Sequence, residues 1–194
     1  MTSYPSITST VNFKLGIVDI CTTASVSLAI SNDMLNKVAA DNTLQTETLT
    51  ATNSAATAQG DSSFCGGYTY SYSLLNPSDT FPFTTPKFWI DGNQIKFTSD
   101  SIADATAMTP SVMDLVFTAV LTDYSTLAGT AAFQISIVDA CESTVISASV
   151  SGDITGVETG GGVVETRIIT TSNSEAVSRS DGNFCGGYDI TYDS

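Results

Sequence analysis

Residues 64–72 read FCGGYTYSY, and the first five of these residues recur as FCGGY at 184–188. Tyr68, Tyr70 and Tyr72 lie two apart, so their side chains share one face of a predicted strand. An aromatic row of this kind can stack on sugar rings. The second copy, however, has Ile190 in the middle of the row. We therefore interpret the row as part of a core.

The recurrence belongs to a longer internal repeat. At an offset of 120, residues 1–74 align with 121–194 without a gap, with 23 identities in 74 pairs. Residues 75–120 occur once. Two explanations stay open: the chain is a window from a longer array, or its incomplete ends complete each other between neighbouring subunits.

Alternation of apolar and polar residues predicts short strands along the chain. The predicted strand faces are Val11, Phe13, Leu15 and Ile17 with their second-copy counterparts Ala131, Phe133, Ile135 and Ile137; Val26, Leu28 and Ile30; and Met113, Leu115, Phe117, Ala119 and Leu121. Residues 88–97 predict a hairpin with its turn at 91–93. No helix of useful length is predicted, although 101–109 can form one or two turns. This pattern indicates an all-β fold, a β-sandwich.

The four cysteines form two pairs, each spaced by 44 residues. The symmetry of the repeat favours the bridges Cys21–Cys65 and Cys141–Cys185, while a Cys65–Cys141 bridge remains an alternative. Such bridges persist only in an oxidising compartment, so we predict an extracellular or cell-surface protein. The chain has no histidine, which excludes a Cys/His zinc site.

Composition excludes several functions. The formal net charge of -14 repels phosphate backbones, so we expect no nucleic-acid partner. No apolar run is long enough for a transmembrane helix. Without histidine there is no triad base, and no phosphate-binding or nucleophile motif occurs. We predict that the chain is not an enzyme and binds no cofactor or metal.

Serine and threonine make up 55 of the 194 residues. They favour strands and polar surfaces, and their hydroxyls can accept O-linked sugar. Four of them line one face of a predicted strand and are the candidate O-glycosylation sites: Thr46, Thr48, Thr50 and Thr52.

Residues 122–124, 137–141 and 64–70 together resemble tandem immunoglobulin-like, cadherin-like repeats of microbial secreted and cell-surface proteins. Some proteins of that class assemble into extracellular glycoprotein fibrils. The resemblance implies immunoglobulin-like β-sandwich repeats with a 120-residue period in a head-to-tail array. The sequence departs from the class at Ile20 and Ala140, where proline is common.

The resemblance also implies a division of the chain. Residues 1–20 are then the closing strands of a preceding repeat, 21–141 one complete repeat, and 142–194 the first half of the next. Two 74-residue domains joined by 75–120 are the alternative division.

These observations predict a structural subunit of an extracellular fibre or cell-surface filament, carrying covalent O-linked glycans. Its expected partners are copies of itself, joined head to tail by strand exchange. The alternative function is a surface adhesin that binds a glycan or a protein, because sandwiches serve both purposes.

Overall fold

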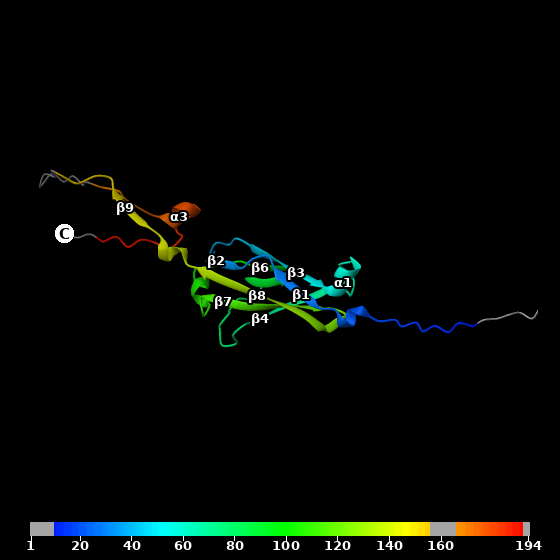
Figure 1. Ribbon diagram of the computed structural model, residues 1–194. Coiled ribbons are helices and arrows are strands. Elements are labelled where there is room, and N and C mark those ends of the chain that lie inside the picture. Colours follow the sequence, from blue (N-terminus) through cyan, green and yellow to red (C-terminus); the bar gives the residue numbers. More distant parts are fainter. Residues whose placement is uncertain (1–9, 156–165, 192–194) are drawn as a thin grey trace, which may run out of the picture.

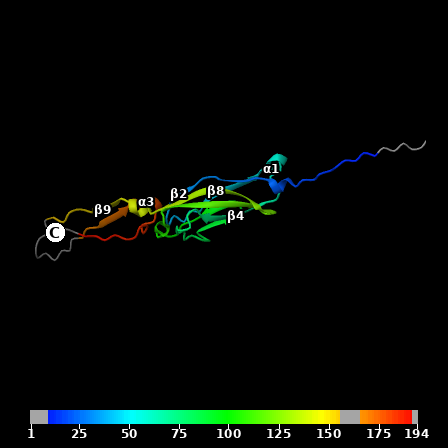
Figure 2. The same ribbon diagram turned by 60° about the horizontal axis from the view of Figure 1, so that its bottom comes forward.

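The computed structural model describes residues 10–155 and 166–191. The predicted segments 1–20 and 142–194 are therefore described only in part. Figure 1 shows a central body of strands, with residues 10–19 extending from one end and β9 and α3 lying beyond the other. Figure 2 shows the same arrangement from a second direction. The described chain is thus elongated, with its copies in line.

Strands dominate the described residues, which confirms the coarse prediction of an all-β fold. The strands are β1 (Val26–Ile30), β2 (Met34–Val38), β3 (Gln45–Asn53), β4 (Tyr68–Leu74), β5 (Phe88–Asp91), β6 (Gln94–Phe97), β7 (Val112–Leu121), β8 (Tyr124–Val138), β9 (Ile146–Val150) and β10 (Ile169–Asn173). The short helices are η1 (Ile20–Thr23), α1 (Ser54–Gln59), α2 (Asp104–Ala107), η2 (Ala140–Ser143) and α3 (Ser174–Arg179).

Residues 20–138, which we call the two-sheet body, contain two four-stranded sheets. One has the order β1-β3-β6-β5 and the other β2-β8-β7-β4. Neighbouring strands are antiparallel except for β2 and β8, which run parallel. A short link separates β1 from β2, so the chain leaves the first sheet and joins the second at once.

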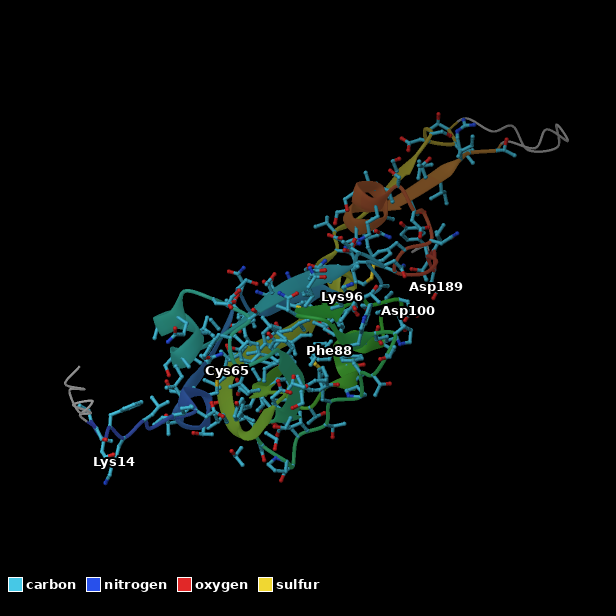
Figure 3. All side chains as sticks on the ribbon, turned by 90° about the vertical axis from the view of Figure 1, so that its right-hand side faces the viewer. Lys14, Cys65, Phe88, Lys96, Asp100 and Asp189 are labelled. Carbon is cyan, nitrogen blue, oxygen red and sulfur yellow. A yellow bond between two sulfur atoms is a disulfide. The ribbon has the colours of Figure 1, made fainter. Side chains whose placement is uncertain are left out.

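The core lies between the sheets, because inward-facing residues of both contribute to one apolar cluster. Every second residue of β7 from Met113 to Leu121 is fully buried, as the alternation predicts. Phe117 lies at the centre, with ring centroids 5.4 Å from Phe133 and 5.6 Å from Tyr72. Figure 3 shows Phe88 among the packed side chains of this body. Tyr72 packs edge-on against Phe88, so the tyrosine row faces the core.

Residues 11–17 differ from the prediction of a strand. They belong to no strand, and Val11, Phe13, Leu15 and Ile17 are 77–89% exposed. Their counterparts in β8 include Phe133 and Ile135, both at 0%. Figure 3 shows Lys14 on this segment, clear of the sheets. The alternating pattern is the same in both copies, but only the second copy has neighbouring strands to pair with.

Residues 140–191, which we call the C-terminal unit, repeat the beginning of the two-sheet body. β9 pairs with β10 antiparallel, as β1 pairs with β3, and the registers match at the offset of 120. The helix α3 follows β10 as α1 follows β3. The sequence did not predict these helices, which are six residues long. Each has an asparagine N-cap and a left-handed residue at its C-terminal end.

Candidate functional site

One disulfide lies at the beginning of the two-sheet body and the other at the beginning of the C-terminal unit. Cys21 bonds to Cys65 and Cys141 to Cys185, with Cα–Cα distances of 5.5 Å in both pairs. These are the pairs that the repeat symmetry favours, and no cysteine is free. Cys21 lies in η1 before β1, and Cys65 lies just before β4. Since β1 and β4 are edge strands of different sheets, the first bridge joins the two sheets at one end of the body.

An aspartate fixes the turn that carries the first cysteine of each pair. Asp19 accepts a hydrogen bond from the Cys21 backbone N–H at 2.9 Å, and Asp139 does the same for Cys141 at 2.8 Å. Tyr124, at the tip of the β7–β8 hairpin, donates its hydroxyl to Asp19 at 2.8 Å. This bond is the main reason that the pKa of Tyr124 is raised. The tip of the β7–β8 hairpin therefore binds the chain at Asp19, just before the two-sheet body begins.

A buried asparagine organises the second cysteine of each pair. Asn53 caps α1 by accepting from the Ala56 backbone N–H at 2.7 Å. Its amide donates to the Phe64 carbonyl at 3.2 Å and to the Tyr68 hydroxyl at 3.0 Å. In the C-terminal unit, Asn173 likewise accepts from the Ala176 backbone N–H and donates to the Phe184 carbonyl and to the Tyr188 hydroxyl. Each FCGGY segment is thus tied to a helix start.

The loop at Cys65 and Gly66 has a left-handed backbone conformation, which few residue types adopt readily. Cys65 and Gly66 have φ values of 73° and 89°, both left-handed. A Cβ on Gly66 would lie 2.6 Å from an Asp123 carboxylate oxygen, so the exposed Asp123 side chain would have to move, and the positive φ also favours glycine there. The backbone N–H of Thr122 donates to the Gly67 carbonyl at 2.9 Å. The tip of the β7–β8 hairpin therefore contacts both this loop and Asp19.

An ion pair joins the two-sheet body to the C-terminal unit. The Arg179 guanidinium at the end of α3 donates to Asp41 at 2.7 Å. It also lies 3.4 Å from Glu175, one turn earlier in the helix. Its central carbon stands 4.4 Å from the ring centroid of Phe184, at cation–π distance. Arg179 therefore connects the FCGGY segment of one unit to the loop between β2 and β3 of the other.

The loop that carries Asp41 is held in an unusual conformation. Its neighbours Ala40 and Asn42 have φ values of 57° and 54°, which non-glycine residues adopt at some energetic cost. Ser99 supports both of them, since its hydroxyl accepts from the Ala40 N–H at 3.0 Å and its carbonyl from the Asn42 N–H at 2.8 Å. Ser99 in turn donates to Asp104 at 2.7 Å.

A lysine holds Asp104, the residue to which Ser99 donates. Lys87 pairs with Asp104 at 2.7 Å and with Asp100 at 2.6 Å. Hydrogen bonds to Asp100 and then to Asp104 raise the pKa of Lys87. On the loop itself, a hydrogen bond from Thr43 is the main reason that the pKa of Asp41 is lowered, and Arg179 adds to it.

The four candidate glycosylation residues Thr46, Thr48, Thr50 and Thr52 are all exposed on the outward face of β3. A hollow of about 260 Å³ lies next to this strand, between its end and α1, and is lined by residues that include Asn53 and Tyr68. A hollow of the same volume recurs at the matching place beside α3. The two copies therefore repeat a surface feature as well as a bridge.

Among residues 10–155 and 166–191, no group of three or more Cys, Asp or Glu side chains could hold a metal ion. In the same part of the chain, no helix has the length and apolar character needed to cross a membrane.

Sequence reasoning identified the cysteines but missed the residues that position them. Asp19, Asn53 and their counterparts Asp139 and Asn173 are among the 23 identities of the repeat. That identity was the signal that could have found them. No such signal marks the Asp41–Arg179 pair, because the residue of the first copy that corresponds to Arg179 is Gln59. Comparison of the chain with protein-family models, curated proteins and solved structures found no match.

Proposed function

We propose that the chain is a structural segment of an extracellular fibre or cell-surface filament, built from disulfide-stapled immunoglobulin-like repeats. The observation that carries the proposal is the pair of matching junctions. The Asp cap, the disulfide and the asparagine network recur 120 residues apart, in copies that lie in line. A module that recurs with its connections intact is suited to propagation along an axis.

The strand order supports the immunoglobulin-like part of the proposal. In such sandwiches one sheet contains the first, second, fifth and fourth strands, and the other contains the third, sixth and seventh. If β1 and β2 count as one strand that changes sheets, β1-β3-β6-β5 and β4-β7-β8 have this order. On this basis we assign 21–141 to one complete repeat, 1–20 to the end of a preceding repeat and 142–194 to the start of the next.

The bridges support a mechanical role. Force that enters before Cys21 passes through the Cys21–Cys65 bond to β4, which pairs with β7 along seven residues from Tyr68 to Leu74. The edge strand β1 is therefore not peeled from its sheet. At the far end, Asp41 and Arg179 oppose bending between the units. A filament under tension needs both properties.

Exposed hydroxyls and the acidic surface support the extracellular part of the proposal. We assign O-linked glycans to the outward threonines of β3. Mass spectrometry of the peptide that contains β3, released by proteolysis from the protein of the natural source, tests this assignment: a mass above that of the bare peptide, in steps of hexose units, is expected. A mass equal to that of the bare peptide contradicts it.

Immunogold electron microscopy of unbroken source cells tests the proposed function. An antibody raised against residues 21–141 is expected to label filaments or stalks at the cell surface, whereas an antibody against a cytosolic protein labels only after lysis. Labelling by both antibodies only after lysis would refute the extracellular structural role.

A surface adhesin is the second candidate function, favoured by the hollow that recurs beside α1 and α3. A paired hollow can bind repeating units of a glycan. Selective, saturable binding on a glycan array supports this candidate, and its loss on filling the hollow with Ala56→Phe localises the site.

A further inference from the structure

Each sheet of the two-sheet body ends in two edge strands, which have a neighbouring strand on one side only. These edge strands are β1 and β5 in one sheet and β2 and β4 in the other. An edge can accept a further strand unless charge, a bulge, a proline or another element blocks it. All four strands lie in residues 20–138, which the structure describes without a gap, so the four edges can be compared directly.

Three of these edges are blocked. β8 lies against β1, so closely that a Cβ on Gly129 would lie 2.7 Å from the Val26 carbonyl oxygen. β2 has an irregular register and carries Lys37. β5 is only four residues long, with Lys87 just before it and Asp91 as its last residue. None of the three therefore offers a straight, uncharged row of backbone groups.

The fourth edge, β4, has none of these obstacles. Its sequence from Tyr68 to Leu74 is YTYSYSL, and no charged residue occurs between Asp61 and Asp79. β4 pairs with β7 along its whole length without a register shift. In Figures 1 and 2, β4 lies along one flank of the body, whereas the chain enters and leaves the body at its ends. β4 is therefore a regular, uncharged edge on the side of the body.

The ladder between β4 and β7 determines which backbone groups of β4 point outward. The Thr122 N–H donates to the Gly67 carbonyl at 2.9 Å, and the Leu75 N–H donates to the Asp114 carbonyl at 3.0 Å. Because an antiparallel ladder alternates, the odd-numbered residues of β4 are the ones that bond to β7. The N–H and C=O groups of the even-numbered residues point to the open side: Tyr68, Tyr70, Tyr72 and Leu74.

A hollow runs beside this edge. It has a volume of about 390 Å³ and lies between β4 and β5, lined by Tyr70 and Tyr72 on one wall and by Phe88 and Ile90 on the other. The two tyrosines are only half-buried, although both face the core. A strand added to β4 would bond to the outward backbone groups and also cover these rings.

We propose that β4 of one chain pairs antiparallel with β4 of a second copy, about a twofold axis that passes through Ser71. The strand is complementary to itself, since the register that pairs all seven residues sets Tyr70 opposite Tyr72 and Tyr68 opposite Leu74. In this register every outward backbone group meets an outward group of the other copy. A twofold contact of this kind closes on itself and gives a dimer.

Charge favours a second copy at this edge over other faces of the body. Each chain has a net charge of -14, so two copies repel each other wherever acidic surfaces meet. The uncharged stretch 62–78 brings no such pair together. Two cross-strand tyrosine pairs form instead, and aromatic pairs stabilise a sheet. The inference goes beyond the proposed function, because it joins chains side by side and not end to end.

Single cysteines test the register. All four native cysteines are in disulfides, so an introduced cysteine is the sole free thiol of its chain. Under mild oxidation, Ser71→Cys is expected to form a cross-linked dimer at least about ten times faster than Ser73→Cys. The reason is distance: the two copies of residue 71 lie about 4.5 Å apart at Cα, which suits a disulfide, and the two copies of residue 73 about 14 Å apart. Mixing Ser73→Cys with Thr69→Cys restores fast cross-linking, because these residues lie opposite each other.

Sedimentation velocity tests the association without a cross-link. The unmodified chain is expected to sediment as a dimer. Ser71→Lys sets two like charges opposite each other on the axis, and is expected to give a monomer at the same concentration. The matched control is Thr50→Lys, which adds the same charge on an exposed position of β3, an interior strand of the other sheet. The control is expected to remain a dimer.

Equal cross-linking rates for Ser71→Cys and Ser73→Cys, or a monomeric unmodified chain, would overturn the pairing through β4. Such a result, with surface labelling of filaments retained, leaves the proposed function standing. Loss of surface labelling together with fast cross-linking of Ser71→Cys refutes the proposed function and supports the pairing.

Discussion

Reduction of the Cys21–Cys65 bridge is expected to lengthen the chain released when the two-sheet body is pulled apart. With the bridge intact, force applied at the two ends bypasses residues 22–64, because it crosses from Cys21 to Cys65 through the sulfur bond. The body then releases only the residues from Cys65 to the end of β8. With the bridge open, the residues between the two cysteines extend as well.

The two cysteines are separated by 44 residues, and an extended residue spans about 3.3–3.6 Å, so opening the bridge adds about 150 Å of contour length. The bridge also limits the entropy of the unfolded chain. A closed loop of this size stabilises the fold by about 4 kcal/mol in the chain-entropy model. The unfolding force is therefore expected to fall as the released length rises.

Single-molecule force spectroscopy, with handles attached at both ends of the chain, measures both quantities. The double variant Cys21→Ser with Cys65→Ser is compared with the wild type in oxidising buffer. The matched control is Cys141→Ser with Cys185→Ser, which opens a bridge of the same 44-residue span outside the two-sheet body. The control is expected to leave the main unfolding step unchanged. An equal released length for the wild type and the first variant would refute the load path through the bridge.

Three further predictions concern the residues around the bridges. Asn53→Ala removes the cap of α1 and leaves a half-buried carbonyl and hydroxyl without their donor, and is expected to lower the free energy of unfolding in urea by about 2–3 kcal/mol. Gly66→Ala combines a φ of 89° with a contact of 2.6 Å to the Asp123 carboxylate, and is expected to cost about 1–3 kcal/mol in the same assay. Asp41→Asn removes the charge that pairs with Arg179, and is expected to increase inter-unit bending at pH 7, measured as a broader distance distribution in small-angle X-ray scattering.

The Asp41 prediction has a pH dependence whose sign follows from its lowered pKa. A lowered pKa means that the folded state favours the carboxylate, so the contact is fully present above the ordinary aspartate pKa and is lost as the pH falls through the lowered value. Acidification is therefore expected to broaden the wild-type distribution toward that of Asp41→Asn. A wild-type distribution that stays narrow at pH 2 would contradict the ion pair as the brace.

Matched controls separate these effects from general loss of structure. Gly60→Ala places a methyl group at a φ of 66° but with no atom within 4 Å, and so measures backbone strain alone. Gln59→Ala removes an exposed amide at the end of α1 and is expected to leave the free energy of unfolding within about 0.5 kcal/mol of the wild type. Gly66→Ala that is no worse than Gly60→Ala would contradict the role of the Asp123 contact.

The sequence alone determined the strand content and the cysteine pairs to expect, for a local reason. The alternation in Met113–Leu121 is a period-two pattern, and a strand must turn such residues to one side. The two cysteine pairs could likewise be predicted without coordinates, because they have equal spacing within a gapless repeat. The same local pattern predicted a strand at 11–17, which is unpaired, because pairing depends on residues far away in the chain.

The tertiary structure alone decided which polar residues form the junctions. Asp41 and Arg179 are 138 residues apart and have no repeat partner with the same chemistry. Asp19 meets Tyr124 across 105 residues because the β7–β8 hairpin returns to the end of the body where the chain enters. Short-range patterns report the direction in which a side chain points relative to its own backbone. Which group it meets depends on how the sheets stack and how the units follow one another, and only the folded chain determines that.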